Sequence, residues 1–225
     1  RPIISTCSRL HSTITMGNFG GALEGNAVNL LRASWLATSY VDLYEVTRYQ
    51  PYLDYAGHIA DSTVKFQNPD GGFPYRVDAN TGAAVELYNP NAMEFVDLVE
   101  KLEPHGFNAT RAMAAQRAVD WMLNCVCGTM NWKASFEDVG PSQFYGNLSQ
   151  MGAQPLIRYL CSHKDQDPSY LPTACNLNRW VEDQFVTFGI ENAASPVRDK
   201  GPLVFEQFDC WWPMEGHTAN WILTL

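Results

Sequence analysis

The sequence predicts an all-α fold in which helical hairpins repeat along the chain and form an α/α toroid, or part of one, or an open curved array. Apolar and amphipathic helical segments alternate, and the pattern recurs roughly every 50–60 residues. The links between these segments are also of two kinds, and short links alternate with long ones along the chain. No strand-like alternation of apolar and polar residues competes with the helical pattern.

The two kinds of helix differ in how apolar side chains surround them. Residues 22–47 are apolar on nearly every side, which predicts an inner helix buried all round. Residues 51–67 have one apolar stripe and one polar face, which predicts an outer helix. The pattern continues at 90–102 with 108–126, at 147–162 with 168–188, and at 217–225. The expected inward stripes of the two later outer helices are Ala112, Met113, Val119, Met122, Leu123 and Val126, and then Leu177, Val181, Phe185 and Phe188.

The two kinds of link must lie on opposite faces of an up-and-down helical array. Links within hairpins are short and polar, as at 45–48 and 162–167. Links between hairpins are longer and rich in glycine, aromatic and acidic residues, at 68–90, 127–146 and 189–216. Long loops of this composition carry function more often than short ones. We therefore expect the functional site on the face of the long links.

Composition limits the partners of the chain. Its 225 residues are 46% hydrophobic, enough for one sizeable core, so residues 1–225 are expected to form a single domain of α/α hairpins. The net charge of −9 argues against a nucleic-acid partner, because phosphate binding needs a basic surface. No run of eighteen apolar residues is present, so no membrane span is expected. The chain begins at Arg1 and stops inside an apolar run, which suggests a processed or incomplete chain.

Six cysteines are spread along the chain, and we expect them to be free, buried thiols. If one disulfide forms, Cys161 with Cys175 across a helical hairpin is the pair that we favour. Asn108 and Asn147 each begin a glycosylation sequon, a match short enough to arise by chance.

Several segments of the chain together resemble the six-hairpin glycosidase superfamily. They are QNPDGGFPY (67–75), GNAVNLL (25–31), GNLSQMGA (146–153), WKASFED (132–138) and EQFDCWWPMEGHTANW (206–221). The resemblance implies an α/α toroid and a carbohydrate-active enzyme, a glycoside hydrolase more than a polysaccharide lyase, that acts on an oligo- or polysaccharide. The chain supplies three hairpins and the start of a fourth, whereas the family has six.

Glycoside cleavage needs two carboxyl groups on either side of the bond and aromatic platforms for the sugar rings. The long links offer Glu137 or Asp138 to pair with Glu206 or Glu215. Substrate platforms are expected at Trp132, Tyr145, Trp211 and Trp212, and His217 could bind a substrate hydroxyl or carboxylate. Asp70 is expected to fix a turn, and Glu182 and Asp183 are expected on a solvated helix face.

Two other kinds of protein fit the same pattern. One is a non-catalytic helical-repeat module that binds a peptide or glycan through the same face. The other is a zinc-dependent toroidal enzyme that uses Asp209, Cys210 and His217, although their spacing does not match such enzymes. We therefore expect no metal and no cofactor. The sequence leaves the sugar, the linkage and the oligomeric state open.

Overall fold

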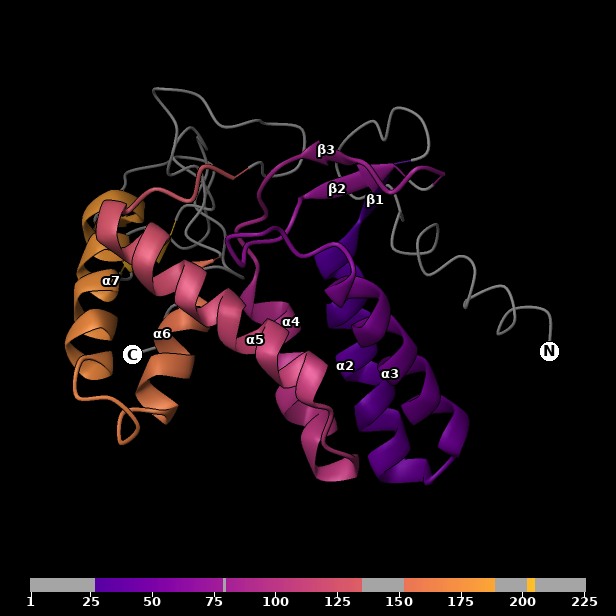
Figure 1. Ribbon diagram of the computed structural model, residues 1–225. Helices are drawn as coiled ribbons and strands as arrows, with labels where there is room; N and C mark the ends of the chain where they lie inside the picture. Colours follow the sequence, from indigo (N-terminus) through magenta and orange to yellow (C-terminus); the bar gives the residue numbers. More distant parts are fainter. Residues whose placement is uncertain (1–26, 79, 135–151, 189–201, 205–225) are drawn as a thin grey trace, which may run out of the picture. The chain divides into compact units, whose positions relative to one another are not determined.

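The computed structural model describes residues 27–78, 80–134, 152–188 and 202–204 (Figure 1). Helices dominate this part of the chain, as the sequence predicts. They are α2 (Leu30–Thr47), α3 (Gln50–Val64), α4 (Met93–Leu102), α5 (Ala109–Trp121), α6 (Ala153–Ser162) and α7 (Tyr170–Phe185). A 3₁₀ turn at Glu103–His105 follows α4, and a π-helical turn at Met122–Cys127 extends α5. No described helix has the length and apolar character needed to cross a bilayer.

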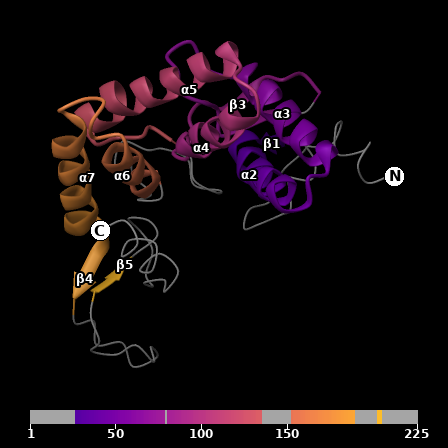
Figure 2. The same cartoon turned by 90° about the horizontal axis from the view of Figure 1, so that it is seen from below.

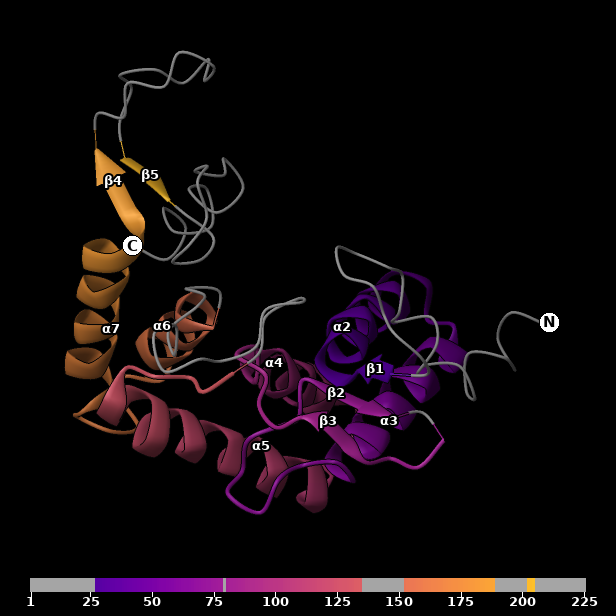
Figure 3. The same ribbon diagram turned by 90° about the horizontal axis from the view of Figure 1, so that it is seen from above.

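The chain divides into two compact units, within residues 1–142 and 143–225. The first unit contains the hairpins α2–α3 and α4–α5, and the second contains the hairpin α6–α7. Within the first unit, α4 packs against α2 and α3 on one side and against α5 on the other (Figures 2 and 3). This neighbour pattern is that of consecutive hairpins in a helical array. The expectation of a single domain stays a prediction.

Local signals set the ends of these helices. The side chain of Asn29 caps α2 by accepting the backbone N–H of Arg32 at 3.3 Å. Arg48 ends the same helix in a left-handed conformation, with φ of 54°. Pro51, in the first turn of α3, needs no hydrogen-bond partner there because proline has no N–H. Short polar links therefore turn the chain sharply between the helices of a hairpin.

The expectation that the first helix is buried all round is wrong. α2 buries one side, but Trp35 is 60% and Val46 is 84% exposed. α2 packs between α3 and α4, and two neighbours cover only part of a helix surface. α4 is the helix with the most completely apolar packing, through Met93, Phe95, Val96, Leu98, Val99 and Leu102.

The expected inward stripe is partly wrong for α5 and is confirmed at three positions of α7. Along α5, Val119, Met122 and Val126 are buried as predicted, but Met113 is 61% exposed. The buried residues near it are small, namely Ala114, Ala115 and Ala118. The link between α3 and α4 approaches α5 closely at Gly71, which leaves little space for large side chains. On α7 the predicted stripe is confirmed at Leu177, Val181 and Phe185, and Asp183 is exposed as expected.

The described ranges also contain five strands of three residues each, which were not predicted. β1 (Ala27–Asn29), β2 (Arg76–Asp78) and β3 (Ala84–Glu86) form an antiparallel sheet in that order, and β4 (Val186–Phe188) pairs with β5 (Pro202–Val204). Val77 of β2 is buried against Leu30 and Phe66, and Arg76 pairs with Glu86 of β3. Strands this short carry too few residues for an alternating pattern to be recognised.

The described cysteines are free thiols. They are Cys125, Cys127, Cys161 and Cys175, so the disulfide that we favoured between Cys161 and Cys175 is wrong. Cys125 and Cys175 are also exposed, contrary to the expectation of buried thiols.

Candidate active site

The long link between α3 and α4 docks tightly on α5. The Arg117 side chain donates to the carbonyl oxygens of Asn68 and Pro69, both at 2.9 Å. Gly71 lies so close that a β-carbon there would stand 2.2 Å from the Arg117 carbonyl oxygen. The aromatic residue that follows, Phe73, is fully buried against Phe95 with ring centroids 5.0 Å apart. The link is therefore a fixed part of the core at one end of the hairpins.

Asp70 fixes the turn, as the sequence predicts. Its Oδ1 accepts the backbone N–H of Gly72 at 3.1 Å, and its Oδ2 accepts the Tyr88 hydroxyl at 2.6 Å. The Asp70 carboxylate raises the pKa of Tyr88 to about 12, because the phenol donates to it. The Tyr88 ring in turn stacks on Trp121 at 5.4 Å. Both ends of the link are thus joined to α5.

Buried asparagines connect the start of α2 with the start of α4. Asn89 is fully buried and its amide nitrogen lies 3.4 Å from Oδ1 of Asn29. Its own Oδ1 accepts the backbone N–H of Asn91 at 2.9 Å. The Asn91 carbonyl then accepts the backbone N–H of Glu94 at 3.0 Å. These bonds hold the first turn of α4 in a defined position.

Glu94, in this first turn of α4, has a carboxyl group that is partly shielded from solvent. The residue as a whole is half-buried, but its Oε2 atom is covered and has no hydrogen-bond partner among the described residues. Buried carboxyl oxygens are nearly always hydrogen-bonded, because leaving one unmatched costs free energy. This unmatched oxygen, on a titratable group directly after a long link, makes Glu94 a candidate functional residue.

Burial governs the protonation of Glu94. Loss of solvation raises its pKa from 4.5 to about 8; the charge of Arg32 opposes this change and that of Asp97 adds to it. Glu94 is consequently a carboxylic acid, not a carboxylate, over most of the neutral range. A protonated carboxyl group in a protected position is able to donate a proton to a bound substrate.

One of the predicted site residues lies in the described part of the chain. Trp132, expected as a sugar platform, is 2% exposed. The remaining candidates fall outside the described residues, so their roles stay predictions: Glu137, Asp138, Tyr145, Glu206, Trp211, Trp212, Glu215 and His217. Asp209 and Cys210, two ligands of the alternative zinc site, also lie outside, and the described residues contain no cluster of three or more metal-binding side chains.

Sequence reasoning missed Glu94. The segment NAMEFVDL places this acid between Met93 and Phe95, two residues that the structure buries completely. An acid between two large apolar residues in the first turn of a helix, directly after a long link, is the signal that could have found it. The four acids predicted as catalytic lie in the long links, whereas Glu94 lies in the first turn of the helix that follows such a link.

Comparisons with known proteins support the fold. No family model and no curated protein matches the chain. Among solved structures, a variant of unsaturated glucuronyl hydrolase with dGlcA-Glc-Rha-Glc, an α/α toroid, is similar with a TM-score of 0.51 and 16% identity, over 81% of this chain and 54% of that one. A D-mannose isomerase is similar with a TM-score of 0.46 and 14% identity, over 80% of this chain and 51% of that one.

The chain thus spans about half the length of these solved structures. At this level of identity, the likeness to the hydrolase concerns the fold. It agrees with the α/α-toroid type of hairpin array that the sequence predicts.

Proposed function

We propose that the chain belongs to a carbohydrate-active enzyme, a glycoside hydrolase, in which Glu94 is the general acid. The observation that carries this proposal is the covered, unmatched Oε2 of Glu94 beside the long link between α3 and α4. The proposal adds Glu94 to the acids that the sequence predicts.

The chemistry follows from the protonation state of Glu94. With a pKa of about 8, the acid still holds its proton at pH 7 and can pass it to the glycosidic oxygen as the bond to the anomeric carbon breaks. Water then supplies the hydroxyl group at that carbon. A second carboxylate must activate the water or attack the carbon directly. We propose that it comes from the four acids predicted from the sequence: Glu137, Asp138, Glu206 and Glu215.

The fold likeness supports a sugar substrate by analogy alone. The hydrolase with the similar fold was solved with a sugar chain bound, but one fold hosts many activities. Glu94 is an observation on this chain itself, independent of that analogy. It supports an enzyme over a simple binding module, since a binding module has no need for a protonated acid.

The test replaces Glu94 by its neutral isostere. Glu94→Gln should keep the fold and reduce single-turnover cleavage of a glycan substrate by roughly 10²–10⁴-fold, the usual contribution of a general acid. Aryl glycosides with a good leaving group should lose much less, because they need little protonation. The matched control is Glu103→Gln, which changes an exposed acid at the other end of α4.

Two results would contradict the assignment of Glu94. One is full activity of Glu94→Gln on a glycan that the parent cleaves. The other is an equal loss on both kinds of substrate, which would mean that the substitution disturbs binding or folding. Amide variants of the four predicted acids, assayed in the same way, identify the second carboxylate.

A further inference from the structure

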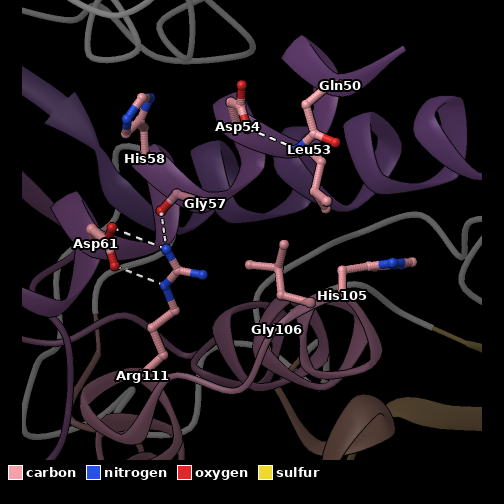
Figure 4. Close-up of a pocket in the computed structure, with 10 residues that line it drawn as sticks. Gln50, Leu53, Asp54, Gly57, His58, Asp61, His105, Gly106 and Arg111 are labelled. Carbon is pink, nitrogen blue, oxygen red and sulfur yellow. Dashed lines mark hydrogen bonds and ion pairs between the residues drawn. The ribbon is translucent and has the colours of Figure 1, made fainter. Parts of the chain in front are cut away.

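A pocket lies at the end of α4 away from Glu94, between α3 and the turn that joins α4 to α5 (Figure 4). Its volume is about 300 Å³, at the lower end of the roughly 300–1,000 Å³ typical of small-molecule sites. Leu102 lines it eight residues after Glu94, which is about 12 Å along the helix axis. The pocket is therefore separate from the proposed catalytic acid.

Arg111 is held rigidly at one side of this pocket. Its Nε and Nη2 donate to the two carboxylate oxygens of Asp61 at 2.7 and 2.9 Å, and Nη2 also donates to the Gly57 carbonyl at 3.1 Å. The side chain is only 15% exposed. Its third nitrogen, Nη1, makes no hydrogen bond with the described residues and points away from Asp61 (Figure 4). Arg111 thus offers two fixed N–H donors to the pocket.

The remaining polar groups supply both donors and acceptors. Asp54 accepts the Gln50 amide through Oδ1 at 3.0 Å, and its second oxygen stays available. His58, one turn further along α3, is exposed and has no hydrogen-bond partner among the described residues. The Nε2 atom of His105 lies 2.7 Å from Oε1 of Glu45, and this contact fixes the imidazole ring.

Small and apolar residues lie between these polar groups. Leu53, Gly57 and Leu102 line the pocket beside Arg111. A β-carbon on Gly57 would stand 3.1 Å from Arg111 Nη2, so a larger side chain there would push against the guanidinium. The absence of a side chain at Gly57 therefore lets the Arg111 guanidinium pack directly against the backbone of α3.

The balance of charge decides the class of ligand. Among the described residues that line the pocket, Arg111 is paired with Asp61 and His105 with Glu45, whereas the carboxylate of Asp54 forms no ion pair. An anion would meet Asp54, and a cation would meet the guanidinium. Hydroxyl groups both donate and accept hydrogen bonds, so they suit a mixed set of fixed donors and acceptors. The C–H face of a sugar ring also suits the apolar residues between them.

We propose that this pocket binds a neutral polyhydroxyl ligand, one sugar ring of a glycan, through Arg111, Asp54 and His58. The proposal concerns binding and does not depend on the hydrolytic role of Glu94. It gives the protein a second contact with a glycan, on the face that carries the short links within hairpins.

The test is a titration of the full chain, labelled with ¹⁵N, with methyl hexopyranosides of the gluco, galacto and manno series. At least one of them should shift the backbone signals of Gly57 and Gly106 in a saturable way. The double variant Asp54→Ala/His58→Ala should weaken that binding about tenfold or more, because it removes two hydrogen-bonding groups. Lys65→Ala, an exposed change at the end of α3 that does not line the pocket, should leave it unchanged.

The same titration can overturn the proposal. It fails if none of the three glycosides shifts Gly57 or Gly106 up to 100 mM, or if the double variant binds as well as the parent. It also fails if glucuronate or glucosamine binds there more tightly than every neutral glycoside, since the site would then select charge. Because Asp54 and His58 are exposed, both substitutions should leave the unfolding temperature nearly unchanged. If the double variant does not fold, the single variants replace it.

Discussion

Gly71 has the closest approach of the described glycines, in the link between α3 and α4. Its φ is +100°, and a β-carbon would stand 2.2 Å from a backbone oxygen of α5. Gly71→Ala should therefore destabilise the protein by at least about 2 kcal/mol, through strain and through displacement of the link. Urea unfolding measures the change. Gly128→Ala is the control, because its φ is negative and its β-carbon would meet nothing within 4 Å.

Equal stability of the two glycine variants would show that the link is not docked on α5. It would also weaken the argument for Glu94, whose helix begins where this link ends. The fixed position of that carboxyl group depends on the fixed position of the link.

Single residues were predictable where the reason for them is local. Asp70 was assigned to a turn because an aspartate before glycines accepts a nearby backbone N–H, and the structure shows that bond. Asp183 was placed on a solvated face from helical geometry, and it is exposed. Glu94 was missed because its role depends on what buries it. The apolar neighbours Met93 and Phe95 are a local signal, but they do not show that the carboxyl oxygen itself is covered in the folded chain.

At the scale of whole elements, Asn108 provides a second test. Its side chain accepts the backbone N–H groups of Thr110 at 3.0 Å and Arg111 at 3.2 Å, which caps α5. Asn108→Ala should cost about 1 kcal/mol in stability, the usual cost of a lost cap. Thr110→Ala abolishes the same glycosylation sequon but keeps the cap, so it should change the stability much less. Unfolding by urea of unglycosylated protein compares the two.

An equal loss of stability in the two variants would mean that the cap contributes nothing measurable. Loosening of the start of α5 should also reach Arg111, which lies in its first turn. The cap variant is therefore expected to weaken the proposed sugar binding as well, whereas the Thr110 variant is not.

The helices were predictable because their periodicity extends over many residues. The predicted segment 51–67 corresponds to α3, and 108–126 corresponds to α5 with its π-helical turn. The inner and outer roles were less predictable, since α2 leaves Trp35 exposed although its sequence is apolar on most sides. Which faces of a helix are covered depends on the number of its neighbours, and the composition of one helix does not report that number.

At the scale of the whole molecule, titrating groups with opposite pKa changes set the dependence of stability on pH. The pKa values of Asp61, Asp78 and Asp167 are lowered, chiefly by hydrogen bonds from the Arg111 side chain and from the backbone N–H groups of Thr81 and Ser169. A lowered pKa stabilises the folded state above the unfolded pKa near 3.8, and this stabilisation is lost as the pH falls through the folded-state value. Stability should therefore fall on acidification below about pH 4.

Glu94 acts in the opposite direction. Its pKa is raised from 4.5 to about 8, so the folded state keeps a proton that the unfolded state has released in this range. The stabilisation is complete below pH 4.5 and is lost as the pH rises towards 8, with a slope of up to about 1.4 kcal/mol per pH unit. Urea unfolding from pH 4 to 9 should show a maximum at the acidic end and a decline across neutral pH. Glu94→Gln cannot titrate and should remove most of that decline, whereas Glu103→Gln should retain it. A decline that persists unchanged in Glu94→Gln would show that the carboxyl group ionises normally in the folded protein, and Glu94 could not then serve as an acid at neutral pH.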